Sequence, residues 1–224
     1  MAVYYNEFDK NAAAWLRELM LSDLIPRGDV DERSIEDVTP QDLHGYTQCH
    51  FFAGIGGWAY ALSLAGWADA APVWTGSCPC QCHSRAAHGR NVAADLWPEF
   101  RRLIVQCRPP VVFGEQVRAA RGWLDGVCSD MEAVGYAFRA RVLPAYSVGL
   151  DHARERIYFE AHSDSYGKPG KSVNGEVALL PRSGSISGGI QETHGFPGRM
   201  ALMRGYGNAI VPEVAAAFVE TCWR

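Results

Sequence analysis

Short apolar runs alternate along this chain with longer stretches in which apolar residues recur every three or four positions. The short runs predict strands, which we place at residues 3–8, 28–30, 48–52, 73–76, 111–113, 137–143 and 156–161. The periodic stretches predict helices, which we place at residues 12–21, 34–43, 58–65, 96–107, 123–134 and 211–221. Strands that alternate with helices indicate an α/β fold with a doubly wound, mainly parallel sheet.

The stretch from Ser163 to Gly198 breaks this alternation. It is rich in Gly, Ser and Pro and has almost no hydrophobic period, which indicates a long loop or a small irregular appendage. We therefore expect three consecutive parts: a main domain at 1–162, an irregular segment at 163–203, and a closing segment with the last helix at 204–224.

Composition narrows the class of protein. The 224 residues suit one α/β domain, and a hydrophobic share of 48% allows a full core. No window approaches the roughly 18 consecutive apolar residues that a membrane span requires, and the first residues lack the layout of a secretory signal. We therefore expect a soluble, cytoplasmic protein with no membrane partner. The seven cysteines are odd in number, which favours free thiols over a disulfide framework.

Charge is unevenly distributed along the chain. The formal net charge of −4 does not by itself indicate a nucleic-acid partner. Residues 1–50 carry ten acidic and four basic side chains, so the remainder is slightly basic. Arginines gather near the loops described below, at Arg85, Arg90, Arg118, Arg121, Arg154 and Arg156. This pattern fits either a nucleic-acid contact or a mixed solvated surface.

Three motifs follow three neighbouring predicted strands. They are the glycine turn from Phe52 to Gly57, the triplet Pro79-Cys80-Gln81, and Glu115. The tips of parallel strands in an open α/β sheet meet in one crevice. A thiol and a carboxylic acid delivered to the same crevice suggest covalent catalysis with proton transfer.

This succession of motifs resembles the DNA cytosine-5 methyltransferases, which have a Rossmann-like fold and use S-adenosylmethionine. The matched segments span most of the chain except 163–203. The resemblance implies that Phe52 lies against the adenine and that the turn residues surround the methionine part. It implies these cofactor residues within the matched motifs: Phe52, Gly54, Ile55, Gly56, Pro79 and Asn208.

Two further cofactor motifs of that family would normally follow the glycine turn, but only about 20 residues separate the turn from Pro79. Similar motifs occur instead near the N-terminus. Glu7 with Phe8 resembles the ribose-binding strand end, and Asp29 with Val30 resembles the adenine-binding strand end. We therefore infer a circular permutation, because the position of a strand in the sheet, not its order in the chain, places its ligands. The alternative is two surface acids in an acidic segment.

The resemblance also implies the catalytic roles. A Cys80 thiolate would add to C6 of cytosine, a carboxyl at Glu115 would hold N3, and an arginine would hold the charge at O2. Arg154 and Arg156 would point to one face of a strand, and Arg156 is the better candidate for O2. The implied DNA contacts are Gln81, Ser84 and Arg85.

Some residues depart from the family pattern. Gln116 replaces the usual asparagine after the glutamate, and Cys82 with His83 follow the catalytic triplet. A zinc site is a rival interpretation of this cysteine-rich loop, with Cys78, Cys80, Cys82, His83 and His88 as its candidate ligands. No second cysteine pair follows at structural-zinc spacing, so we predict no metal.

The expected partner is double-stranded DNA, and we infer no obligate protein partner. The family's large recognition domain is replaced here by the 163–203 segment, so we expect a short target of about two to four base pairs. Such a compact form would fit an enzyme of a phage or mobile element. A non-catalytic DNA-binding or cofactor-binding remnant and the same chemistry on RNA stay open alternatives.

Overall fold

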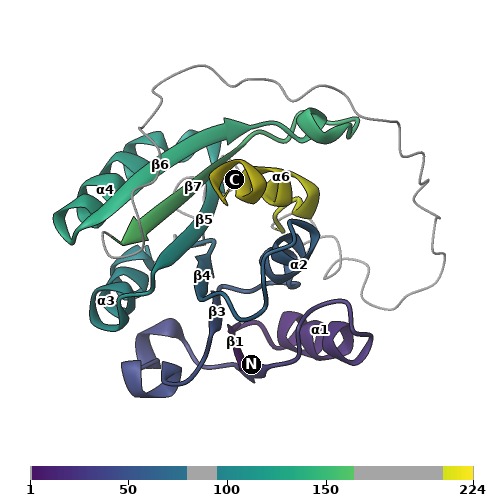
Figure 1. Cartoon of the computed structure of the whole chain (residues 1–224), viewed down its shortest axis with the longest axis vertical. Coiled ribbons are helices and arrows are strands. Elements are labelled where there is room, and N and C mark those ends of the chain that lie inside the picture. Colours follow the sequence, from purple (N-terminus) through teal and green to yellow (C-terminus); the bar gives the residue numbers. More distant parts are fainter. Residues whose placement is uncertain (1, 80–94, 164–208, 224) are drawn as a thin grey trace, which may run out of the picture.

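The computed structural model describes residues 2–79, 95–163 and 209–223 (Figure 1). These residues form one sheet in the order β2-β1-β3-β4-β5-β7-β6. Its strands are β1 (Val3–Asn6), β2 (Asp29–Asp31), β3 (Gln48–Phe51), β4 (Val73–Gly76), β5 (Val111–Val117), β6 (Tyr136–Leu143) and β7 (Arg156–Ser163). The first five are parallel, and β7 runs antiparallel to both β5 and β6. The mainly parallel α/β sheet is thus confirmed.

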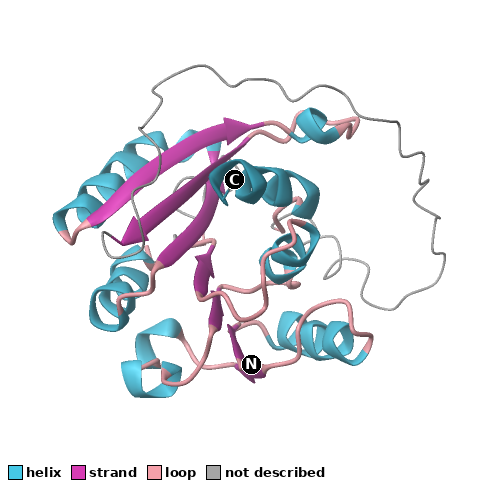
Figure 2. Ribbon diagram, viewed as in Figure 1, coloured by secondary structure: helices cyan, strands magenta, loops and turns pink. Residues whose placement is uncertain are grey.

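Helices cover both faces of the sheet (Figure 2). They are α1 (Lys10–Leu21), α2 (Gly57–Leu64), α3 (Trp97–Cys107), α4 (Arg121–Ala133) and α6 (Pro212–Trp223). Figure 1 shows α1, α2 and α6 on one face and α3 and α4 on the other. Within the described residues no helix is long and apolar enough to cross a membrane.

The N-terminal residues belong to the sheet and do not form a separate arm. Strand β1 lies between β2 and β3, with Val3 opposite Gln48 and Asn6 opposite Phe51. The first two strands of the chain therefore occupy one end of the sheet, beside the strand that precedes the glycine turn. This is the arrangement that a circular permutation predicts.

One predicted element is wrong. Residues 34–43 form no continuous helix but two short 3-10 turns, η1 (Ile35–Asp37) and η2 (Pro40–Leu43). Pro40 has no backbone N–H, so it fits the first turn of a helix but not its interior. The chain is accordingly extended at Val38 and Thr39. In contrast, α1 is confirmed and begins at Lys10, two residues before the predicted start at residue 12, because the Asp9 carboxylate accepts from the backbone N–H groups of Asn11 and Ala12.

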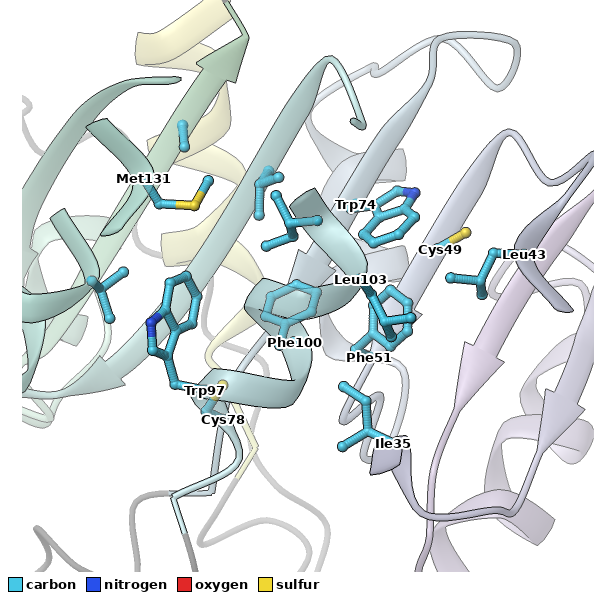
Figure 3. Close-up of a cluster of buried hydrophobic side chains, with 14 of the residues drawn as sticks. Ile35, Leu43, Cys49, Phe51, Trp74, Cys78, Trp97, Phe100, Leu103 and Met131 are labelled. Atoms are coloured by element: carbon cyan, nitrogen blue, oxygen red, sulfur yellow. The ribbon is translucent and has the colours of Figure 1, made fainter. Parts of the chain in front are cut away.

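An aromatic cluster supports the end of β4 (Figure 3). The Phe100 ring on α3 lies 5.0 Å from Phe51 and 6.4 Å from Trp74, centroid to centroid. A Cβ atom on Gly76 would lie 2.5 Å from the Phe100 ring. Only glycine therefore lets α3 pack this closely on the strand end that leads into Ser77 and Pro79.

His50 supplies a test of this core. It is 1% exposed, its ring stacks on Tyr5, and its Nδ1 lies 2.8 Å from the Thr75 hydroxyl. Burial lowers the pKa of His50 to about 3. The unfolded chain therefore takes up a proton near pH 6.5 that the folded chain does not.

We predict that His50 makes the protein less stable as the pH falls below about 6.5. The free energy of unfolding of wild type relative to His50→Gln should decrease from pH 7.5 to pH 5, measured by urea unfolding. The exposed His44 provides the matched control, because His44→Gln should keep the wild-type dependence. A wild-type to His50→Gln difference that stays constant across this range would contradict the prediction.

Candidate active site

The glycine turn follows β3 in a constrained backbone conformation. Phe52, Gly54 and Gly56 have φ angles of 51°, 57° and 80°, all in the left-handed region. Phe52 is not a glycine, so its conformation costs on the order of 1 kcal/mol. Its ring packs edge-on against Phe100 at 6.2 Å. The fixed turn leaves open space at Gly54, where an added Cβ meets nothing nearer than 3.9 Å.

Glu7 reaches this turn from the neighbouring strand. Its Oε2 accepts from the Gly54 backbone N–H at 2.6 Å, and its Oε1 accepts from the Asp9 N–H at 2.8 Å. Burial raises the pKa of Glu7, and these two bonds partly offset that effect. The adjacent Phe8 ring is 73% exposed. The structure thus brings together Glu7 and a turn that lies 47 residues away in the chain.

Asp29 is the first residue of β2 and lies two residues before the carboxyl end of that strand. It pairs with Tyr4, whereas Asp31 pairs with Asn6 at the carboxyl end of the strands. The Asp29 carboxylate accepts instead from the Tyr46 hydroxyl at 2.6 Å. Since β2 runs parallel to β1, its carboxyl end is Asp31. The sequence motif points to the first residue of β2, and the cofactor role of Asp29 stays a prediction.

Asp31 is already engaged at that carboxyl end. It accepts from the Tyr4 hydroxyl at 2.7 Å and forms an ion pair with Arg33. These residues line an open hollow of about 440 Å³ on the outer edge of the sheet. Val30, between the two aspartates, packs against the core under α1.

Glu115 and Arg156 form an ion pair where β5 and β7 meet, with Glu115 buried and Arg156 partly buried. Arg156 Nε lies 2.9 Å from Glu115 Oε1, and Glu115 is 6% exposed. The antiparallel register places Arg156 opposite Val117, two residues from Glu115 on the same face. Burial raises the pKa of Glu115 to about 7, against the lowering effect of Arg156 and Arg154. Glu115 therefore holds a proton part of the time at neutral pH.

Arg154 has a different place from the one expected. Strand β7 begins at Arg156, so Arg154 does not continue its face. Arg154 Nη2 donates to the Ala209 carbonyl at 2.6 Å. This bond joins the residues just before β7 to the residues just before α6. The charge of Arg154 still lowers the pKa of Glu115. Asn208, next to Ala209, lies outside the described residues.

Gln116 holds the end of β4 in place, a role that the sequence did not indicate. It is 2% exposed, and its Nε2 donates to the Cys78 carbonyl at 3.1 Å. Its Oε1 accepts from the Val117 N–H at 2.8 Å. Adjacent strand residues face opposite sides, so Gln116 and Glu115 act on different faces. The sequence marked Gln116 only as a departure from the family pattern.

Pro79 is the last described residue before the segment that contains the nucleophile candidate. Cys80, Gln81, Ser84 and Arg85 lie outside the described residues, as do the zinc-ligand candidates Cys82, His83 and His88. Cys78 is described and is 5% exposed. Burial raises the pKa of the Cys78 thiol well above its usual value, so Cys78 stays a neutral thiol. The described residues contain no cluster of potential metal ligands.

The fold is that of a known class of enzymes. The chain superposes on a mutant of Spodoptera frugiperda DNMT2 with a TM-score of 0.51 and 12% identity, over 81% of this chain and 56% of that one. Entamoeba histolytica methyltransferase EhMeth gives a TM-score of 0.46 and 10% identity, over 82% and 58%. A putative DNA modification methyltransferase from prophage Cp of E. coli gives 0.42 and 13%, over 74% and 47%. The superposition on Spodoptera frugiperda DNMT2 establishes the Rossmann-like methyltransferase fold.

The family follows from sequence. Residues 68–183 match the model of the C-5 cytosine-specific DNA methylases, and the chain belongs to that family. C-5 cytosine methyltransferases of this fold use S-adenosylmethionine as methyl donor. The chain spans little more than half of the DNMT2 chain, 56% of its length. No curated protein sequence matches it.

We predict that the hydrogen bond from Gln116 to the Cys78 carbonyl stabilises the folded chain. Gln116→Ala leaves the buried Cys78 carbonyl without its donor, which should lower the free energy of unfolding by about 1–3 kcal/mol. Denaturant unfolding at pH 7.5 measures this. The exposed Gln106 on α3 is the control, since Gln106→Ala should change stability by less than about 0.5 kcal/mol. Equal effects of the two substitutions would show that the Gln116 contact contributes nothing.

Proposed function

We propose that this chain transfers a methyl group from S-adenosylmethionine to C5 of cytosine in DNA, through a covalent bond between Cys80 and C6. The observation that carries the proposal is the ion pair between the buried Glu115 and the partly buried Arg156. It lies at the same edge of the sheet as the glycine turn that Glu7 contacts. A proton-bearing carboxyl and a cation are the groups that a cytosine ring needs when it receives a nucleophile.

The residues at the glycine turn fit the cofactor. Each Glu7 oxygen accepts one backbone bond, and a carboxylate oxygen can accept more than one. Glu7 is therefore able to bind the two ribose hydroxyls. The exposed Phe8 ring and Phe52 offer apolar surfaces for the adenine, and the open space at Gly54 admits the methionine part. The proposed pocket is completed by Ile55, Gly56, Pro79, Asn208, Asp29 and Val30.

When bound, S-adenosylmethionine supplies an electrophilic methyl group. The protein's part begins with the Cys80 sulfur, whose electron pair forms a bond to C6 of the base. The C5–C6 π electrons are displaced, so C5 becomes nucleophilic. The Glu115 carboxyl hydrogen-bonds or protonates N3, and Arg156 holds the negative charge that gathers at O2. A pKa near 7 lets Glu115 give and regain this proton at neutral pH.

Release of the product reverses the covalent step. After C5 is methylated, it loses its proton to solvent, and that electron pair re-forms the C5–C6 double bond. The Cys80 sulfur leaves with the electrons of the S–C6 bond, and Glu115 recovers its proton from N3. The protein's own groups are all restored, and the site can act on another base once the demethylated cofactor has been exchanged for a new methyl donor.

DNA is the proposed substrate because the matched family is one of DNA methylases. The target base must leave the stacked duplex to reach Cys80. Gln81, Ser84 and Arg85 are proposed to contact the DNA, and the 163–203 segment to read a short target.

Cofactor binding tests the role of Glu7. Glu7→Ala should weaken S-adenosylmethionine binding by about 1–3 kcal/mol, on the order of a tenfold or greater rise in Kd, because charge-assisted bonds are lost. Isothermal titration calorimetry measures it. Glu36→Ala, at an exposed acid in the same acidic segment, should leave the Kd unchanged. A Glu7→Ala protein that folds and binds as tightly as wild type would remove Glu7 from the pocket.

Covalent trapping tests the nucleophile and the substrate together. DNA that contains 5-fluorocytosine should form a stable adduct with the wild type, because fluorine cannot leave C5 as a proton does. Peptide mapping should place the adduct on Cys80. Cys80→Ser should abolish both the adduct and methyl transfer while its Kd for S-adenosylmethionine stays within about twofold. An adduct on Cys78, or adducts with RNA but not DNA, would refute the corresponding part of the proposal.

A further inference from the structure

Arg154 is hydrogen-bonded to the segment that leads into α6. Its Nη2 donates to the Ala209 carbonyl at 2.6 Å. A hydrogen bond from a charged donor is stronger than one between neutral groups, so this contact can hold the backbone at residue 209 in place. Arg156, two residues further along the chain, pairs instead with Glu115. The two arginines of this stretch therefore make their close contacts with different parts of the molecule.

Ile210, the residue after Ala209, lies against the first turn of α2. Its side chain is 7% exposed and belongs to the same apolar cluster as Trp58. Gly57 is the first residue of α2, and a Cβ atom on it would lie 2.7 Å from Ile210 Cγ1. Two carbon atoms that are not bonded cannot approach so closely. Glycine at position 57 is therefore what admits the Ile210 side chain.

The short segment 209–211 thus connects the glycine turn with the start of β7. Gly57 directly follows Gly56, whose left-handed backbone ends the glycine turn. Figure 1 shows α2 and α6 on the same face of the sheet, and the two helices are in contact. The segment is held by the Arg154 guanidinium on one side and packs on Gly57 on the other. Movement of the segment away from Arg154 would consequently move Ile210 away from the turn.

We propose that Arg154 is a positioning residue for the cofactor site, which keeps residues 209–211 packed against the glycine turn. This inference rests on the proposed function, in which that turn surrounds S-adenosylmethionine. A turn that is already held in its binding conformation binds a ligand more tightly, because less ordering is required on binding. In this role Arg154 touches no reacting atom, whereas Arg156 is proposed to hold O2 of the base.

Affinity for S-adenosylmethionine tests the inference without methyl transfer. Arg154→Met removes the donors, keeps an unbranched side chain, and should raise the Kd roughly tenfold in isothermal titration calorimetry. Arg154→Lys keeps a charged donor and should recover most of the affinity. The exposed Arg141 on β6 gives the matched control, because Arg141→Met should keep the Kd within about twofold of wild type. A folded Arg154→Met protein with the Kd of Arg141→Met would overturn the inference.

Kinetics separate this role from one at the base. Arg154 lowers the pKa of Glu115, so its loss raises that pKa above about 7, and at pH 6 the carboxyl is protonated in both proteins. At pH 6, Arg154→Met should therefore raise the KM for S-adenosylmethionine roughly tenfold and change kcat by less than about threefold. Arg156→Met should show the reverse, with kcat lost and the Kd for S-adenosylmethionine within about twofold of wild type. An Arg154→Met enzyme that behaves like Arg156→Met would contradict the proposal.

A double-mutant cycle tests the link through Ile210. Gly57→Ala should also weaken S-adenosylmethionine binding, because its methyl group displaces Ile210. If Arg154 and Gly57 act through the same segment, the double variant should raise the Kd by much less than the product of the two single effects. Gly122→Ala on α4 is the control, because a Cβ atom there meets nothing within 4 Å. Single effects that simply multiply would show that the two residues act separately, and the inference would fail.

Amide hydrogen exchange gives a readout that needs no ligand. Arg154→Met should speed exchange in the peptides that cover α2 and α6, because the segment that connects them to Arg154 is released. Helix α3, on the other face of the sheet, should keep the wild-type rate. Wild-type exchange throughout α2 and α6 would count against the role of Arg154.

The two hypotheses fail in different ways. If the wild type binds S-adenosylmethionine but transfers no methyl group to cytosine, the proposed function fails, and the Kd and exchange comparisons still decide the role of Arg154. If methyl transfer occurs but Arg154→Met keeps the Kd of Arg141→Met and the wild-type exchange, only the role of Arg154 fails.

Discussion

Parallel pairing of β1, β3, β4 and β5 is the constraint on which the site depends. Parallel strands end at the same edge of a sheet, so residues that follow them meet whatever their order in the chain. This is why Glu7, near the N-terminus, can accept a bond from Gly54 in the turn after β3. Chain order is free to be permuted as long as each strand keeps its neighbours.

The antiparallel strand β7 supplies the cation that pairs with Glu115. Its antiparallel register with β5 brings Arg156 beside Glu115 in a place from which water is largely excluded. A buried ion pair contributes little to stability, because desolvation offsets most of the attraction. Here the balance leaves the pKa of Glu115 at about 7. We interpret the pair in terms of the proposed proton transfer by Glu115, and not as a source of stability.

Packing on both faces makes this edge rigid. The Phe100 ring fills the space beside Gly76 on one face, and the Trp58 indole is wedged between aromatic rings on the other. Gln116 then fixes the Cys78 carbonyl between these layers. The strand end before Pro79 is consequently held from three directions, which suits the proposed role of the adjoining Cys80 as nucleophile.

The sequence alone determined the alternation of strands and helices and the motifs, because the hydrophobic period and the motif residues are encoded within short stretches of the chain. Register and contacts between distant residues were decided only by the tertiary structure. Asp29 matched a motif, yet only the folded chain shows that it pairs with Tyr4 and accepts from the Tyr46 hydroxyl. The elevated pKa of Glu115 likewise needs burial and charges from other strands. Those effects depend on how far the folded chain excludes water, which no local pattern contains.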